Sequence, residues 1–98
     1  MQFAVRVSNY QKNTMLNICD VELLGKQISQ DELNMKISES YYGEKLVDKE
    51  EAKSLLQTSS IINMVGKNTV SLSIELGIGS ESVIKTISDI PFLIVFKV

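Results

Sequence analysis

The sequence of 98 residues contains no histidine and no tryptophan, and only one cysteine and one proline. The lack of histidine excludes Ser-His-Asp and Cys-His catalytic arrangements and every metal site that relies on imidazole. Cys19 alone can form neither a thiolate zinc cluster nor an intramolecular disulfide, which is typical of a reducing compartment. Neither a P-loop nor a GxGxxG pattern occurs. We therefore expect no metal, no cofactor and a cytoplasmic location.

Long apolar runs and an excess of positive charge are also missing. No segment approaches the roughly 18 apolar residues of a membrane span, and residues 1–6 alternate like a strand instead of resembling a signal peptide. Ten basic and twelve acidic residues give a net charge of −2, which argues against nonspecific DNA binding. A chain this short has room for one core, so we expect a single domain, residues 1–98.

The first half of the chain carries mainly strand patterns. Apolar and polar residues alternate over 3–7 and 33–37, which predicts strands, and the mainly apolar residues 15–19 are interpreted as another strand. The segments 3–7 and 15–19 flank a polar turn, which predicts a hairpin. Residues 20–26 run from a helix-cap residue to Gly25, which predicts one short helical turn. Residues 38–45 follow neither period and are expected to form an ordered loop.

The second half carries helix signals followed by strands. Asp48 and Glu51 resemble a capping box, so a helix should start at Lys49. A second helix is expected over 61–76, unbroken at Gly66, although a break near this glycine stays open. Strands follow over 83–87 and 92–96, and the last is apolar on both faces, which favours the middle of a sheet. The predicted fold class is α+β, a single two-layer domain of order βββααββ, with a mostly antiparallel sheet packed against two helices.

Two segments hold the candidate binding residues. In the loop, Tyr41 and Tyr42 are able to stack on a base or a partner side chain, and Gly43 admits another backbone, although one tyrosine closing the core edge explains the same pattern. In the expected helix, Asn63, Gly66 and Lys67 form the second group. Asn63 either ties the core together or contacts a ligand, because a buried amide must find hydrogen-bond partners. Cys19 is interpreted as a buried structural thiol.

The chain resembles a known family in several short motifs that follow one another in a fixed order. These are Cys-Asp at 19–20 with Leu-Leu-Gly-Lys at 23–26, Ser-Glu-Ser-Tyr-Tyr-Gly at 38–43, Asn-Met-Val-Gly at 63–66 and Ile-Glu-Leu-Gly at 74–77. Together they are similar to the archaeal family known as domain of unknown function four-two-four. The resemblance implies a small archaeal cytoplasmic protein in a translation setting, with Tyr42, Gly43, Asn63 and Gly66 as candidate positions and no assigned catalytic residue.

Three functions are compatible with these observations. The first is a noncatalytic binding module, not an enzyme, whose partners are ribosomal or translation proteins or structured RNA. The alternative is a small-molecule or nucleotide-handling enzyme without histidine or metal, in which Asn63 orients a substrate and Asp20 or Glu39 moves a proton. The third is self-association through an exposed edge strand at residues 3–7.

Overall fold

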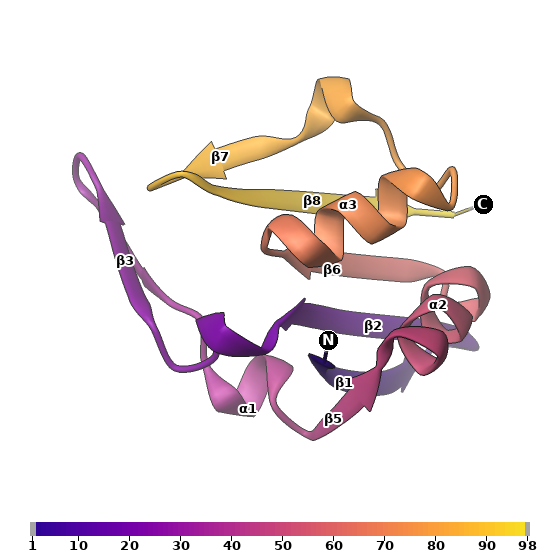
Figure 1. Ribbon diagram of the computed structural model, residues 1–98. Coiled ribbons are helices and arrows are strands. Elements are labelled where there is room, and N and C mark those ends of the chain that lie inside the picture. Colours follow the sequence, from indigo (N-terminus) through magenta and orange to yellow (C-terminus); the bar gives the residue numbers. More distant parts are fainter. Residues whose placement is uncertain (1, 98) are drawn as a thin grey trace.

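The computed structural model describes residues 2–97, and Figure 1 shows their arrangement. In chain order the elements are β1 (Gln2–Tyr10), β2 (Asn13–Asp20), the 3-10 turn η1 (Val21–Leu23), β3 (Gln27–Gln30), β4 (Leu33–Lys36), α1 (Glu39–Tyr42), β5 (Lys45–Asp48), α2 (Lys49–Thr58), β6 (Ile61–Val65), α3 (Lys67–Glu75), the 3-10 turn η2 (Glu81–Val83), β7 (Lys85–Ile87) and β8 (Ile90–Phe96). None of the helices among these residues is long and apolar enough to cross a membrane.

Six strands form the main sheet in the order β5-β1-β2-β6-β8-β7, and β3 pairs with β4 in a separate hairpin. Every neighbouring pair is antiparallel except β2 and β6. A parallel pair needs a long crossover, and here the chain between β2 and β6 supplies it and includes α2. The predicted hairpin of β1 and β2 and the mostly antiparallel sheet are confirmed.

The predicted order βββααββ is wrong because several elements were missed. The third strand lies outside the main sheet, since β4 pairs only with β3 among the described residues. The expected loop at 38–45 contains α1, where the Ser38 hydroxyl accepts a hydrogen bond from the Tyr41 amide, and the start of β5. Elements of four residues are too short for a periodic pattern to stand out in a sequence.

The helix expected over 61–76 is also wrong in its first part. Residues Ile61–Val65 form strand β6 between β2 and β8, and helix α3 begins only at Lys67. Gly66 makes the break with φ of +111°, a conformation that side chains with a Cβ rarely adopt. The expected strand over 83–87 is likewise divided into η2 and the shorter β7.

The two faces of the main sheet are covered differently. We call the face under α2 and α3 the helix face; there, side chains such as Phe3, Leu16 and Ile62 form the larger core with both helices, which lie in front of the sheet in Figure 1. We call the opposite face the hairpin face; α1 and the β3–β4 hairpin cover part of it, around Ala4 and Cys19. The prediction of two layers is therefore incomplete, because a third, partial layer is present.

Candidate functional site

The predicted binding residues fall into two separate places. Tyr41 and Asn63 lie together on the hairpin face, where both line one groove. Gly66 and Lys67 lie at the carboxyl end of β6, where they line a different cleft. The structure therefore separates Asn63 from Gly66 and Lys67, with which the sequence grouped it.

The two tyrosines of α1 have different environments. Tyr42 is 8% exposed and packs in the core of the hairpin face, and burial, followed by the neighbouring Tyr41, raises its pKa to about 12. Tyr41 is 44% exposed, and its ring meets that of Tyr42 edge-on with 5.0 Å between the ring centroids. Gly43 ends the helix where a Cβ would lie 2.9 Å from the Glu39 carbonyl oxygen. Of these three residues, Tyr41 presents the side chain available to a partner.

A pair of asparagines connects the sheet to α1. Asn63 Nδ2 donates to Asn17 Oδ1 at 2.7 Å, and Asn17 Nδ2 donates to the Tyr41 carbonyl oxygen at 3.2 Å. The two residues are direct partners in the register of β2 and β6, and Asn17 is only 1% exposed. Asn63 is half-buried, so it ties the core together and also forms part of the groove wall.

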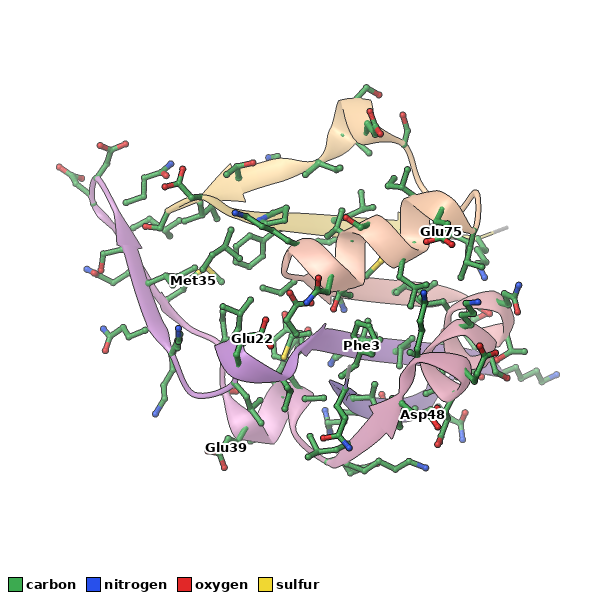
Figure 2. The ribbon with its side chains drawn as sticks, in the orientation of Figure 1. Phe3, Glu22, Met35, Glu39, Asp48 and Glu75 are labelled. Carbon is green, nitrogen blue, oxygen red and sulfur yellow. The ribbon has the colours of Figure 1, made fainter. Side chains whose placement is uncertain are left out.

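The groove beside Asn63 has a volume of about 210 Å³ and is mainly apolar. Its walls come from α1, β4, β6 and β8, with Tyr41, Met35, Phe92 and Ile94 among the lining residues. Met35 belongs to the β3–β4 hairpin, which stands beside the main sheet in Figure 2. A second hollow of about 140 Å³ lies on the other side of Phe92 and Ile94 and is lined by Val83 and Lys85.

Beyond this groove, part of the hairpin face is left to solvent. We call this part, together with the exposed side chain of Tyr41 at its border, the open face; its members in the sheet are half-buried or exposed and are Arg6, Met15, Ile61, Asn63, Lys85, Ile94 and Phe96. Strand alternation and the registers of β1, β2, β6, β7 and β8 place the sheet members on one side of the sheet. Ile94 is 58% exposed and Phe96 is 71% exposed, so large apolar side chains point to solvent here.

The carboxyl-end cleft is the second site and has a volume of about 420 Å³. It lies where the parallel strands β2 and β6 both end, and its lining residues are Asp20, Glu22, Leu23, Lys26, Gly66, Lys67, Asn68, Ser88, Asp89, Ile90 and Pro91. Figure 2 labels Glu22 on η1, at the edge of this region.

Asp20 caps helix α3 from the floor of the cleft. Its carboxylate accepts from the backbone amide of Asn68 at 3.0 Å, and from the amide and the hydroxyl of Thr69 at 2.7 Å each. Asp20 is 3% exposed, so hydrogen bonds from the helix amides replace the hydrogen bonds to water that its carboxylate loses on burial. Gly66 is needed here because a Cβ would lie 2.6 Å from Asp20 Oδ2. Both residues therefore have a structural role in joining β6 to α3.

Cys19 sits next to Asp20 and is fully buried. Burial, then the charges of Asp20 and Glu22, raise the pKa of the thiol from 9.0 to about 12. Because the thiolate is the reactive form, a thiol with this pKa is a poor nucleophile at neutral pH. The residue behaves as a small apolar side chain of the core.

Comparison with known proteins gives a family and a fold. A family model described as "Protein of unknown function (DUF424)" matches residues 8–98. The chain belongs to this family. The resemblance found in the sequence is thereby confirmed. No curated protein sequence matches the chain.

One solved structure is similar to this family member. It is the crystal structure of an uncharacterized conserved protein from Methanopyrus kandleri, with a TM-score of 0.81 and 19% sequence identity. The match covers 100% of this chain and 95% of the other. At this identity the likeness shows a shared fold, including an archaeal example of it, and nothing about a ligand.

Several residues of this family member that shape the site were not found from the sequence. Asn17 was missed although it is a polar residue inside an apolar strand, a signal that usually marks a side chain with a specific partner. Ile94 and Phe96 were expected to be enclosed because the last strand is apolar on both faces. The strand does lie inside the sheet, but Leu93, on its helix face, is its one buried residue.

Two of the functional hypotheses rest on placements that the structure does not provide. The edge-strand hypothesis is wrong for residues 3–5, which pair with β5 on one side and β2 on the other, whereas residues 6 and 7 pair with β2 alone within the described residues. The enzyme hypothesis paired Asn63 with Asp20, but strand alternation places Asn63 on the hairpin face and Asp20 on the helix face. Glu39, the other carboxylate considered, is exposed on the outer side of α1 (Figure 2).

Proposed function

We propose that the chain is a noncatalytic binding module that uses the open face to hold a macromolecular partner of the translation apparatus. The observation that carries the proposal is the exposure of Tyr41, Ile94 and Phe96 on one side of the sheet, at 44%, 58% and 71%. Clustered exposed apolar side chains on a small protein are typical of an interaction site. The translation setting comes from the family resemblance, whereas the contact surface comes from the geometry.

The chemistry of this surface supports binding more than catalysis. The polar side chains at its centre, Asn17 and Asn63, are amides, which neither gain nor lose a proton near neutral pH. Asn63 supplies hydrogen bonds that orient a partner, and the buried Asn17 holds Asn63 in place. The nearest buried acid, Asp20, has its carboxylate oxygens occupied by the amides and hydroxyl at the start of α3.

The proposal is tested by affinity purification of the tagged chain from cells that express it naturally, with and without RNase. The test compares the wild type with Ile94→Ser and Phe96→Ser. Leu33→Ser is a matched control, because Leu33 is also exposed, at 46%, but lies on the β3–β4 hairpin outside the open face. We expect ribosomal or translation components with the wild type and the control, and their loss with both open-face variants.

Two outcomes would contradict the proposal. One is recovery of the same components by the open-face variants, which would place the contact elsewhere. The other is recovery of the chain alone from every sample. Circular dichroism of each variant checks that a lost partner does not reflect lost folding.

A second candidate function is a small-molecule or nucleotide-handling enzyme, and the carboxyl-end cleft is the observation that favours it. The cleft of about 420 Å³ lies at the carboxyl ends of two parallel strands, where open sheets commonly bind ligands. Lys26 and Lys67 on its walls suit a phosphate-bearing compound. A thermal-shift screen of nucleotides, repeated with Lys67→Ala, tests it; a shift that the variant retains would argue against this cleft.

A further inference from the structure

We propose that the partner of the open face is an unpaired segment of RNA. Tyr41 and Phe96 would stack on bases, and Arg6 and Lys85 would neutralise phosphates. This inference rests on the proposed function and names the chemistry of its partner. Three features of the open face support it: the sign of its charge, the placement of its aromatic rings and the free hydrogen-bonding capacity of Asn63.

The charge of this side of the sheet is the first feature. Strand alternation and register assign Arg6 of β1 and Lys85 of β7 to the hairpin face. Among the strands of the main sheet within residues 2–97, the one acid that register places on this face is Asp48, at the end of the edge strand β5, where its carboxylate caps α2. The positions that β1, β2, β6, β7 and β8 contribute to this face are not acidic. A chain with a net charge of −2 thus presents a positive surface beside its exposed apolar side chains, which is the complement of a phosphate backbone.

The aromatic rings are the second feature. Tyr41 stands at one side of the groove, next to Asn63 and Ile94, and Phe96 follows Ile94 by two positions along β8. Two positions along a strand correspond to about 7 Å, and the side chains of Ile94 and Phe96 point to the same face. Exposed aromatic rings spaced along a sheet are the usual platforms on which unpaired bases stack.

The shape of the surface suits a single RNA strand that crosses β8. Phe92 and Ile94 form a ridge between two hollows of about 210 Å³ and about 140 Å³. The larger hollow is lined by Tyr41 and Asn63, and the smaller one by Lys85. A nucleotide strand laid over the ridge places a base in the first hollow and a phosphate near the ammonium group in the second.

Asn63 is the third feature. Its side-chain amide uses one N–H to bond Asn17, and its Oδ1 has no hydrogen-bond partner within the part of the chain that the structure describes. The remaining N–H and the oxygen provide a donor and an acceptor at the groove wall, which matches the edge of a base. Asn17 holds this amide in place, because it is itself anchored to the Tyr41 carbonyl oxygen.

A second copy of the chain is a poorer match for this surface. In a two-fold dimer the same patch would face itself, so Arg6 and Lys85 of each copy would meet a face on which β1, β2, β6, β7 and β8 carry no carboxylate. Duplex RNA is also a poorer match, because its bases are stacked on one another and are not available to Tyr41 and Phe96.

The test is fluorescence anisotropy of labelled single-stranded RNA oligonucleotides titrated with the intact chain at two salt concentrations. A duplex of the same sequence and the corresponding single-stranded DNA serve as competitors. We expect saturable binding of the single strand and weaker binding of the duplex. Phe96→Ala and Tyr41→Ala should each weaken binding by about tenfold, as expected for the loss of one stacked base.

Charge variants separate phosphate contacts from stacking. Lys85→Gln should weaken binding similarly for all sequences and reduce the slope of log affinity against log salt by about 0.7. Leu33→Ala and Lys36→Gln, both on β4 and outside the open face, are the matched controls and should bind like the wild type. Thermal unfolding of each variant verifies its fold.

Three results would overturn the RNA inference. The first is the absence of binding at about 100 μM chain, a concentration at which even nonspecific RNA binding is normally detected. The second is equal binding of the duplex and the single strand. The third is binding that the Phe96 and Tyr41 variants leave unchanged. If RNA binding fails while RNase-resistant recovery of a translation protein still depends on Phe96, the proposed function stands and the partner is a protein. If that recovery fails as well, both are wrong.

Discussion

At the scale of single residues, Gly66 and Asp20 together form the junction between β6 and α3. Gly66 has the positive φ that turns the chain from strand to helix, and its missing side chain leaves room for the Asp20 carboxylate. The carboxylate then satisfies amides at the start of α3. A change at either position therefore affects the backbone turn and the helix cap at once.

Gly66→Ala should reduce the free energy of unfolding by about 3 kcal/mol or more, because it combines a strained φ with a collision against a buried, hydrogen-bonded carboxylate. Gly77→Ala is the matched control. Its φ is also positive, at +76°, but an added Cβ would meet no described atom within 4 Å, so we expect a loss of only about 1 kcal/mol. Urea unfolding measures both values, and equal losses would show that the collision is relieved at little cost.

Ser59 is a residue whose replacement should stabilise the fold. Its side chain is 1% exposed, and its hydroxyl has no hydrogen-bond partner among residues 2–97. Because a buried unsatisfied hydroxyl carries a desolvation cost, Ser59→Ala should raise the free energy of unfolding by about 1 kcal/mol. Thr58→Ala, which removes an exposed hydroxyl bonded to the Ser54 carbonyl oxygen, should give no such gain. A loss of stability in Ser59→Ala in urea unfolding would contradict the argument.

At the scale of elements, the two ends of α2 are satisfied by different kinds of partner. At its start, Asp48 Oδ1 accepts from the Glu51 amide at 2.9 Å, a local cap that the sequence pattern predicted. At its end, Lys97 reaches back from the far end of the chain and donates to the carbonyl oxygens of Leu56 at 2.6 Å and Gln57 at 3.1 Å. The second contact exists only in the folded chain.

Lys97→Met should lower the free energy of unfolding by about 1 kcal/mol, because the last carbonyl groups of α2 lose a cationic donor. The loss should shrink at high salt, since part of it is an interaction between a charge and the helix dipole. Lys36→Met, an exposed position on β4, should stay within about 0.5 kcal/mol of the wild type. Thermal and urea unfolding at two salt concentrations test this, and equal effects of the two substitutions would refute it.

At the scale of the whole molecule, the buried thiol of Cys19 and the buried hydroxyl of Tyr42 make the free energy of unfolding fall at alkaline pH. Burial is the main cause that raises the pKa of Cys19 from 9.0 to about 12 and that of Tyr42 from 10.0 to about 12. The folded state therefore holds these protons more tightly than the unfolded state does. Stability from this source is complete below pH 9.0 and is lost as the pH rises toward about 12.

Urea unfolding across this range should show a falling free energy of unfolding, with a slope of up to about 1.4 kcal/mol per pH unit for each group. In Cys19→Ala, measured beside the wild type with a reductant present, the fall should begin near pH 10.0, where Tyr42 starts to contribute, instead of near pH 9.0. Parallel curves for the two proteins between these values would rule out a titrating Cys19.

The sequence by itself determined the features that depend on near neighbours in the chain. The hairpin of β1 and β2 with its polar turn, the cap at Asp48 and the end of the second helix near residue 76 were predicted because each is decided within a few residues. The motifs also led to the correct family. Short elements such as α1 and β5 were not predicted, because contacts with distant segments of the chain hold them in place.

Only the tertiary structure decided that residues 61–65 form a strand and how much of the hairpin face stays exposed. The run Ile-Ile-Asn-Met-Val satisfies a helical and a strand period equally, and it became β6 because β2 and β8 hydrogen-bond to its two sides. This choice placed Asn63 beside Asn17 and Tyr41, away from Gly66 and Lys67. Because α1 and the β3–β4 hairpin cover only part of the hairpin face, Ile94 and Phe96 stay exposed, which no local pattern in an apolar strand reveals.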